Sequence, residues 1–382
     1  MNAPAINLEV LPAGYGDCLL VSCPVGDRLW RMLVDTGPDE CWPQLRERLS
    51  KIAPDSRGRR HIDLAVISHI DHDHIGGAAL LFNDNSLGLS IGDIWFNAPP
   101  RRLARGVVEG VSLATLLGAT AADLPWNKAF GGKHVATRGD GGFVELPTTE
   151  GMPRITLLSP TPARWTSLFK VWDRELERLR RREVEKLQQP EAAPRGAAAL
   201  DLEALAASVT KVDAAPANGS SIAFLLEHEG ASVLLAADAF ATVLSPALQA
   251  LARHRKQPGD LSVDAIKLSH HGSKGNVTTE LLKSVRADHY IVSTNGAIFK
   301  HPDDEAIARV VLNCGRRHSL CFNYRNERSL RWADESRLAQ HGCRVVLPEA
   351  GREGFALALG TGKLHSTSNP TRGRPQDAPV ST

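Results

Sequence analysis

The residues best able to do chemistry stand together in one short segment, Ser68-His69-Ile70-Asp71-His72-Asp73-His74-Ile75-Gly76-Gly77. An apolar run over 64–67 precedes five potential metal ligands. Side chains of an extended chain alternate between two sides, so residues 69, 71 and 73 point the same way. The glycine pair then lets the backbone turn into a helix at low steric cost. Neutral imidazoles and ionised carboxylates in this arrangement can surround two adjacent cations, so the segment predicts a metal site.

The alternative is a polar surface loop that holds three histidines by chance. An order of strand, ligand cluster, glycine pair and helix is hard to explain in that way, so we favour metal binding.

A framework of strands and helices must carry this segment. Branched apolar residues predict strands over 6–11, 19–22 and 30–34, and apolar residues at helical spacing predict a helix over 42–52. Regular alternation resumes with two strands over 221–226 and 232–236 and continues to 355–359.

The stretch between these blocks, about 98–217, is expected to be a large insertion with a helix near 103–117. Residues 165–186 predict an amphipathic helix. We favour a solvated charged face for it over a basic arm above a phosphate-bearing substrate, because acidic residues interrupt the basic ones. Residues 190–199 suggest a flexible linker.

The first segment resembles the first metal motif of metallo-β-lactamase-fold hydrolases, HxHxDH followed by two glycines. Aligned from the glycines backwards, His69 takes the place of the first histidine, Asp71 that of the second, and Asp73 and His74 the final pair. HxDxDH is similar to the version in ComEC-type competence proteins and phosphorylcholine esterases. A carboxylate hardens the site, so Mn²⁺ becomes a rival to Zn²⁺. In this alignment His72 is a solvent-facing bystander.

Other segments agree with this resemblance. Gly14-Tyr15-Gly16-Asp17 and Leu33-Val34-Asp35-Thr36-Gly37 resemble the GxGD and LIDTG motifs of such proteins. The resemblance implies that Asp35 orients a metal ligand by hydrogen bonding. Leu234-Leu235-Ala236-Ala237-Asp238 resembles the strand whose final aspartate bridges both metals, with Ala237 where glycine is usual. An aspartate after a strand is otherwise most often a helix cap.

The segment Lys267-Leu268-Ser269-His270-His271-Gly272-Ser273-Lys274 resembles the HHGS motif of the ComEC-type branch. The resemblance implies that one histidine binds metal and that its neighbour faces the substrate as a hydrogen-bond donor or acid. Sequence does not assign the two; we favour His271 as the ligand and His270 as the substrate contact. Lys274 and the helix N-terminus near Gly76 are expected to stabilise negative charge on the reacting group.

Two features are less specific. Asn218-Gly219-Ser220-Ser221 stands where many relatives have a third-motif histidine, so one metal is expected to be completed by water or to be absent. His134 is a poor substitute, because a loop histidine in a glycine-rich stretch is usually solvated. His301, in Phe299-Lys300-His301-Pro302, resembles a GHP-like element and is a candidate substrate contact.

The overall composition is that of an ordinary globular protein, with 382 residues, 42% hydrophobic and 23% charged. A net charge of +2 gives no global basic field, so a nucleic-acid ligand would have to be held by local features. Six cysteines without a CxxC pair predict free thiols. No signal-peptide pattern and no membrane-spanning apolar run are present in the sequence. We therefore expect a cytoplasmic protein with no membrane partner.

Taken together, these features predict an α/β protein, a four-layer αβ/βα sandwich with two sheets face to face, helices outside and the site at one edge. One domain over 1–360, including the insertion at about 98–217, is expected to precede a disordered tail over 361–382.

The resemblance implies a hydrolase with two divalent cations, Zn or Mn, in which a metal-bridging hydroxide attacks the substrate. Asp73 would accept the proton of that water, and Asp238 would fix the metal separation. A phosphodiester of a nucleic acid or nucleotide is the expected substrate, by analogy. The alternatives are hydrolysis of a thioester, lactone or amide, or a non-catalytic partner subunit that uses the fold for docking. The expected metal ligands are His69, Asp71, Asp73, His74, Asp238 and His271.

Overall fold

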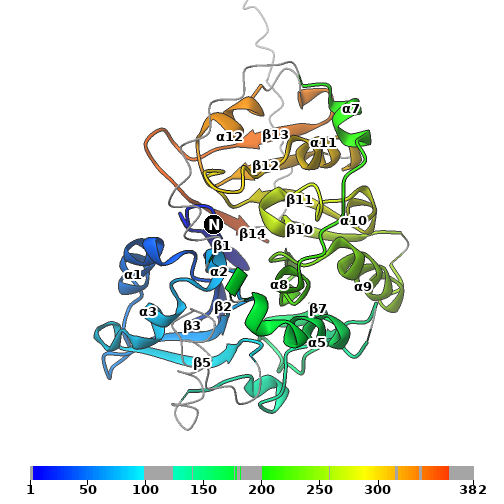
Figure 1. The fold of residues 1–382 in the computed structure, drawn as a ribbon. Helices are drawn as coiled ribbons and strands as arrows, with labels where there is room; N and C mark the ends of the chain where they lie inside the picture. Colours follow the sequence, from blue (N-terminus) through cyan, green and yellow to red (C-terminus); the bar gives the residue numbers. More distant parts are fainter. Residues whose placement is uncertain are drawn as a thin grey trace, which may run out of the picture.

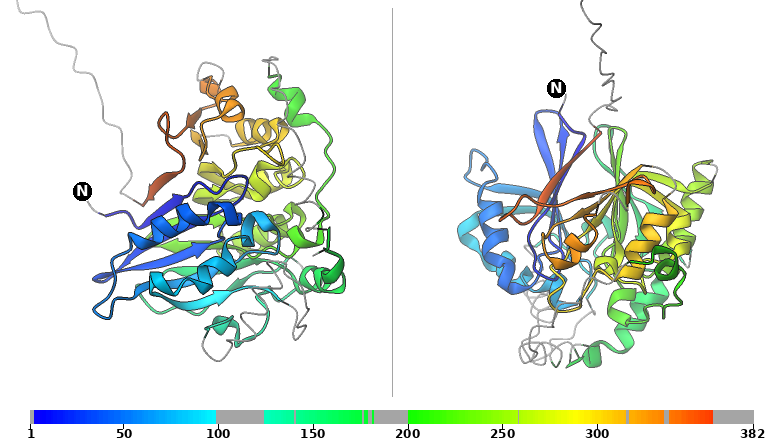
Figure 2. Two further views of the ribbon diagram at one scale, coloured as in Figure 1. Left: turned by 60° about the vertical axis from the view of Figure 1, so that its left-hand side comes forward. Right: turned by 90° about the horizontal axis from the view of Figure 1, so that it is seen from above.

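The computed structural model describes residues 3–98, 124–181 except 140, 176, 179 and 180, and 200–360 except 258, 315, 316 and 335–337. Two β-sheets pack face to face, and helices cover the outer side of each, as the view from above in Figure 2 shows. This arrangement confirms the predicted four-layer α/β sandwich, and Figure 1 labels its elements. None of the described helices is long and apolar enough to cross a membrane.

The first sheet has six strands in the order β14-β1-β2-β3-β4-β5. Strands β1 to β3 are antiparallel neighbours, whereas β3, β4 and β5 run parallel. Helices α1 (Trp42–Ser50) and α3 (Ala78–Asn83) bury leucines against its outer face. The strands are β1 Ile6–Val10, β2 Leu19–Val25, β3 Arg28–Val34, β4 Arg60–Val66, β5 Leu89–Trp95 and β14 Phe355–Leu359.

The second sheet has eight strands in the order β13-β12-β11-β10-β9-β8-β7-β6. Strands β9 to β13 are parallel, and β6 to β9 pair antiparallel. The strands are β6 Val144–Glu145, β7 Arg154–Ser159, β8 Ala223–His228, β9 Ala231–Leu235, β10 Leu261–Lys267, β11 Val285–Val292, β12 His318–Phe322 and β13 Cys343–Val346.

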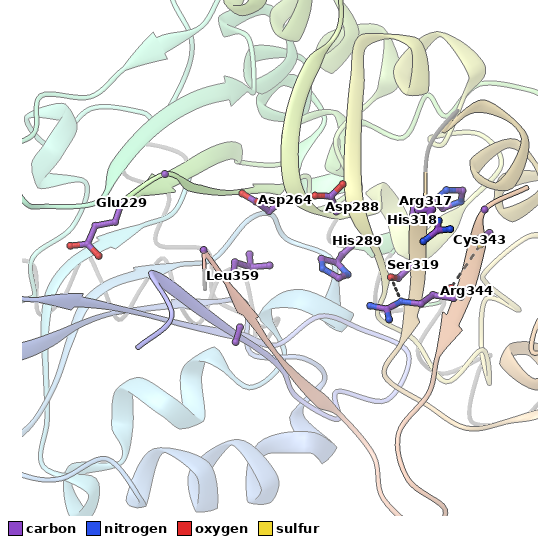
Figure 3. A pocket seen from close by; sticks show the side chains of 14 residues that line it. Glu229, Asp264, Asp288, His289, Arg317, His318, Ser319, Cys343, Arg344 and Leu359 are labelled. Atoms are coloured by element: carbon purple, nitrogen blue, oxygen red, sulfur yellow. Dashed lines mark hydrogen bonds between the residues drawn. The ribbon is translucent and has the colours of Figure 1, made fainter. Parts of the chain in front are cut away.

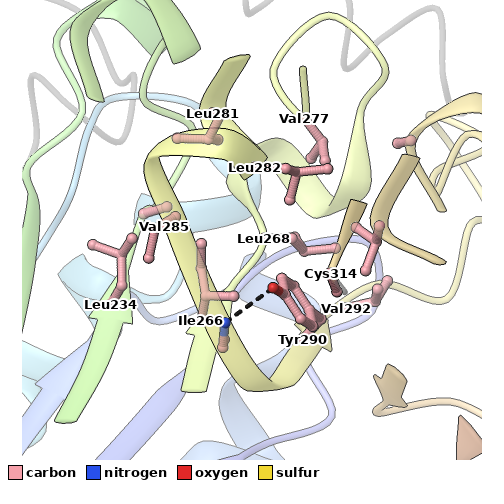
Figure 4. Packing of buried hydrophobic residues seen from close by; sticks show 14 of the residues in the cluster. Leu234, Ile266, Leu268, Val277, Leu281, Leu282, Val285, Tyr290, Val292 and Cys314 are labelled. Atoms are coloured by element: carbon pink, nitrogen blue, oxygen red, sulfur yellow. Dashed lines mark hydrogen bonds between the residues drawn. The ribbon is translucent and has the colours of Figure 1, made fainter. Parts of the chain in front are cut away.

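The hydrophobic core has an inner layer between the sheets and outer layers beneath the helices. Figure 4 shows the outer layer of the second sheet, where Leu234 and Ile266 meet Leu281. The Tyr290 hydroxyl accepts a hydrogen bond from the Ala287 backbone N–H (3.0 Å), so its polar end is satisfied inside this layer. The covering helices are α9 Ala241–His254, α10 Thr279–Ser284 and α11 Asp304–Asn313.

The range 98–217 differs in part from a simple insertion, because β6 and β7 from within it belong to the second sheet. Helix α5 (Pro162–Lys170) follows β7 and is continued by helical residues 172–175. The predicted helix near 103–117, the linker over 190–199 and the tail over 361–382 lie outside the described residues. The remaining short elements are η1 Asp39–Cys41, α2 His72–Ile75, η2 Asn85–Leu87, η3 Lys128–Phe130, α7 Leu202–Ala207, α8 Pro216–Gly219, η4 Ser269–Gly272 and α12 Glu327–Arg331.

Candidate metal centre

Candidate ligands from both sheets meet at one edge of the sandwich. Parallel strands end at the same edge, which is where α/β proteins usually place ligands. The loop after β4 carries His69, Asp73 and His74, Asp238 follows β9, and His271 follows β10. Three buried groups have ligand atoms within 4.8 Å of one another: His69, His74 and Asp238; Asp73, His74 and His271; and Asp17, Asp35 and His74.

His74 belongs to all three groups, and Asp238 lies beside it. Asp238 Oδ1 is 3.3 Å from His74 Nε2 and 3.8 Å from His271 Nε2, and Asp238 Oδ2 is 3.9 Å from His69 Nε2. The same His271 Nε2 atom also lies 3.3 Å from Asp73 Oδ2. The carboxylate of Asp238 therefore faces imidazoles from both halves of the chain.

Unusual backbone conformations aim these side chains. Ala237, His270 and His271 all have positive φ, at 44°, 48° and 54°. Such conformations cost non-glycine residues about 1–3 kcal/mol each and cluster at functional sites. The left-handed backbone at Ala237 explains why glycine is usual there, and it leaves the Asp238 carboxylate directed into the cluster. Gly16 is required by a close approach, since a Cβ there would lie 1.9 Å from the Asp73 carbonyl oxygen.

Hydrogen bonds fix the orientation of two imidazoles. His74 Nδ1 lies 2.8 Å from Asp35 Oδ2, and Asp35 Oδ1 accepts from the Ser68 backbone N–H. His271 Nδ1 donates to the Ser293 carbonyl oxygen at 2.8 Å. Both rings consequently present Nε2 to the cluster, the usual arrangement of metal-binding histidines. The geometry of Asp35 agrees with its expected orienting role.

Atoms without partners indicate that this cluster fits cations. Among the described residues, His69 Nε2, Asp71 Oδ1 and Asp238 Oδ1 are buried and find no hydrogen-bond partner. Buried polar atoms are normally satisfied, so the unpartnered atoms of His69 and Asp238, which belong to one group, fit a cation. Asp71 lies in the same loop as His69 but is in none of the three groups. All three are atom types that bind Zn²⁺ or Mn²⁺.

The electrostatics support the same conclusion. Burial lowers the pKa of His69 to about 3, which keeps its imidazole neutral and able to ligate. Burial, together with the negative charge of Asp73, raises the pKa of Asp71 to about 7. Like charges crowded in this way would be relieved by a divalent cation.

His270 is held differently from its neighbour. Its Nε2 lies 3.7 Å from Asp238 Oδ2, while its Nδ1 lies 3.1 Å from Asn276 Oδ1 and 3.5 Å from Asp213 Oδ2. Asp213 also accepts from the side-chain amides of Asn218 and Asn276, at 2.7 and 3.0 Å. Asp213 was missed from sequence, because it stands in no motif and meets His270 only through the fold.

A buried ion pair beneath the cluster was also missed. The Lys267 ammonium pairs with the Asp17 carboxylate, and neither side chain is more than 1% exposed. Burial works against ionisation of Asp17, but the charges of Lys267 and His271 hold its pKa below the usual range. The charge of Lys267 between the apolar residues Ile266 and Leu268 was a signal that could have revealed this pair.

The other predicted residues are placed less uniformly. The His301 ring lies beside that of His270, with centroids 5.0 Å apart, so the structure brings it to the rim. The Lys274 ammonium instead bonds Glu305 at 2.8 Å, away from the ligand atoms. His72 is buried, contrary to the solvent-facing placement expected from sequence; it faces Asp39 at 3.1 Å, outside the three central groups. His134 stacks on Trp165.

A separate pocket of about 780 Å³ lies near the opposite ends of the parallel strands (Figure 3). His289, Arg317 and Arg344 line it together with Asp264 and Asp288. It contains none of the candidate metal ligands. This pocket is therefore separate from the candidate metal centre.

Comparisons with known proteins agree with this architecture. A family model described as "Metallo-beta-lactamase superfamily" matches residues 14–296, more than half of the chain. A search of curated protein sequences gave no match.

Solved structures with a similar fold share little sequence with the chain. The metallo-beta-lactamase fold protein YhfI from Bacillus subtilis is 11% identical, with 92% of this chain and 98% of that one covered and a TM-score of 0.40. Zn(2+)-bound PqqB from Methylobacterium extorquens is 12% identical, with coverage of 93% and 100% and a TM-score of 0.40. Unliganded yeast PDE1 is 10% identical, with coverage of 92% and 99% and a TM-score of 0.43.

Proposed function

The chain belongs to the metallo-beta-lactamase superfamily, and on that basis we propose that it is a metal-dependent hydrolase of phosphodiesters. The observation that carries this proposal is the set of buried His and Asp groups that share His74, with Asp238 beside it. Neither stability nor packing explains why unpartnered ligand atoms should converge there. A catalytic metal centre does.

Two divalent cations would be held at this edge. His69 and Asp71 would serve one of them and Asp73 and His271 the other. His74 and Asp238 lie close to both His69 and His271 and would be available to both. When bound, such cations acidify a water molecule and polarise the oxygen of the substrate that receives negative charge. The carboxylate-rich ligand set supports Mn²⁺ as well as Zn²⁺.

The chain's own residues would handle the protons. Asp73, ionised and facing the cluster, would accept the proton of the attacking water. Burial works against protonation of His270, but the charges of Asp238 and Asp213 outweigh it and raise its pKa to about 9. Cations at Asp238 would cancel the part of this rise that Asp238 supplies. Asp213, 3.5 Å from His270 Nδ1, would then be the group that holds the ring and favours its protonated form, from which Nε2 donates a proton to the leaving oxygen. His301 would line the same side of the site.

A phosphodiester fits this arrangement better than a neutral acyl substrate. A protonated imidazole at the rim favours a substrate that is already anionic and a leaving group that needs a proton. The HxDxDH and HHGS spacings support a ComEC-type nuclease or phosphodiesterase as the more specific form of the proposal. We assign no such role to Lys274, since Glu305 engages its ammonium. A cytoplasmic location stays a prediction.

The test combines metal content with turnover. Elemental analysis of the purified protein should find up to two cations per chain. Screens with Zn²⁺ and Mn²⁺ should give metal-dependent hydrolysis of bis(p-nitrophenyl) phosphate, single-stranded DNA, RNA or cyclic nucleotides. Asp71→Ala and Asp73→Ala should each lose at least one cation, whereas the matched control His72→Gln should keep both.

The alternatives give different outcomes. Hydrolysis of p-nitrophenyl acetate or a thioester without turnover of any phosphodiester would indicate an acyl hydrolase. A protein that holds no cation and turns over nothing would indicate a docking subunit.

A further inference from the structure

Residues 208–215, called the strap below, connect helix α7 to helix α8 and form no helix or strand of their own. Helix α7 packs on α11, and from there the strap runs across the molecule to α8 (Figure 1). Val209 and Val212 of the strap are 102% and 49% exposed, so apolar burial holds little of it. The position of the strap therefore depends on polar contacts with the rest of the protein.

One buried arginine anchors the start of the strap. Arg309 lies on α11 and is only 4% exposed. Each of the five N–H groups of its guanidinium has an acceptor, and all of these acceptors are neutral oxygen atoms. They are the Ala206 carbonyl (3.3 Å from Nε), the Ser208 carbonyl and Thr210 hydroxyl (2.9 and 3.1 Å from Nη2), and the Lys274 and Val277 carbonyls (2.8 and 3.1 Å from Nη1). A single side chain thus joins the strap to the turn that follows the histidine pair.

Backbone contacts continue this attachment as far as Asp213. The Asp213 N–H donates to the Gly275 carbonyl oxygen at 3.3 Å. A Cβ on Gly275 would lie 3.0 Å from the Lys211 carbonyl oxygen, so the strap and the turn touch backbone to backbone. The Asp213 carboxylate in turn lies 3.5 Å from His270 Nδ1. The same pair of segments that Arg309 holds together therefore carries Asp213 on one side and His270 on the other.

We propose that Arg309 is a positioning residue of the candidate catalytic site, which fixes the strap against the turn and so places Asp213 where it orients the His270 ring. This inference rests on the proposed function and extends it to a residue of the outer helical layer. Arginine suits the task because its planar fork offers five donors in fixed directions, whereas lysine offers three from one point. Without this anchor Asp213 would shift, and a misplacement of about 1 Å can lower a catalytic rate by about a hundred-fold.

The experiment uses the purified, metal-loaded full-length protein with bis(p-nitrophenyl) phosphate as the substrate. Arg309→Lys should lower kcat by about 10- to 100-fold and leave KM and metal content near their wild-type values. Asp213→Ala should lower kcat at least as much. The double variant should lose no more than Asp213→Ala alone, because Arg309 acts through Asp213; an arginine that only supports the fold would give multiplied losses.

Two further variants complete the series. Thr210→Val removes one of the five acceptors and should lower kcat by a smaller factor; it also serves if Arg309→Lys does not fold. Arg255→Lys is the matched control, because Arg255 is another partly buried arginine but bonds Glu227 and Glu145, outside the candidate metal centre. Its kcat should equal that of the wild type even if its stability falls.

Hydrogen exchange followed by mass spectrometry gives a readout that needs no turnover. Backbone amides of residues 206–213 should exchange faster in Arg309→Lys than in the wild type, whereas those of α9 should not change. This result would show that the guanidinium holds the strap in place.

A wild-type kcat in Arg309→Lys, or the same fold-loss with and without Asp213, would overturn the inference and leave the proposed function standing. If the wild-type protein hydrolyses no phosphodiester, the proposed function fails, and hydrogen exchange then decides the inference. Faster exchange of the strap in Arg309→Lys would support it, and unchanged exchange would overturn it.

Discussion

Lys267 and Asp17 lie fully inside the molecule, so the variant Lys267→Met leaves the Asp17 carboxylate there without its ammonium. Methionine nearly preserves the side-chain volume, and the loss is therefore mainly electrostatic. Removing one partner of a buried ion pair costs about 3–5 kcal/mol. With a urea slope of about 3 kcal/mol/M, the unfolding midpoint should fall by about 1–1.7 M.

The pH dependence gives a second readout of this variant. In the wild type the pKa of Asp17 is depressed, so the pair contributes stability above the ordinary carboxyl pKa and loses it as pH falls through the lower, folded value. Without Lys267, burial should raise the pKa of Asp17 instead. The difference in stability between wild type and variant should then shrink as the pH falls from 7 to 5, because the buried Asp17 carboxyl of the variant can take up a proton.

Urea unfolding of chelator-treated protein, followed by circular dichroism, is the assay. The matched control is Lys51→Met, whose pair with Glu47 is exposed on the surface, and its midpoint should not move measurably. The double variant Asp17→Asn with Lys267→Met should lose less than the sum of the single losses, since neither charge is left alone. A midpoint drop below about 0.3 M at pH 7, or a deficit independent of pH, would refute the reasoning.

Four other outcomes are expected. His271→Ala should lose metal, whereas His270→Ala should keep it and lower kcat by about a hundred-fold or more, as measured by elemental analysis and kinetics; unchanged metal and turnover in both would contradict the site. Asp213→Asn should lower kcat with metal content unchanged, because it loosens the His270 ring, and Asp213→Glu should restore part of it; an unchanged kcat would argue against positioning. Ala237→Gly should raise the urea midpoint slightly, because glycine relieves about 1–2 kcal/mol of left-handed backbone strain and adds only about 0.4–1 kcal/mol of entropy to the unfolded chain; a lower midpoint would contradict this. Asp238→Asn should reduce metal binding.

Sequence could predict those parts of the site that a single short loop determines. His69, Asp73 and His74 lie within six residues, so local backbone geometry sets their relation, and their closeness was predictable. Asp71, from the same loop, is in none of the three groups, so its role as a ligand stays a prediction. The two sheets followed from the same kind of local pattern, alternation of apolar residues.

Contacts between distant segments were not predictable in this way. Asp213 and His270 are in contact although they lie 57 positions apart in the sequence, and no spacing rule links them. Lys274 illustrates the opposite error: it stands beside the histidines in sequence, but its long side chain reaches Glu305 instead. The prediction assigned strand β7 to the insertion, because its pairing with β8 forms only when the second sheet is assembled and leaves no signal in the local sequence.

The division of the ligand groups between the two sheets has a consequence for the protein's lifetime. A cation held by His69 and His74 from one half and by Asp238 from the other would resist separation of the halves, because it binds only when they are docked. At a free concentration about a thousand times its dissociation constant, it would add about 4 kcal/mol to folding. Metal starvation would then reach beyond catalysis: it would loosen the seam between the sheets, expose the core to proteases and make abundance of the protein follow the cellular metal supply.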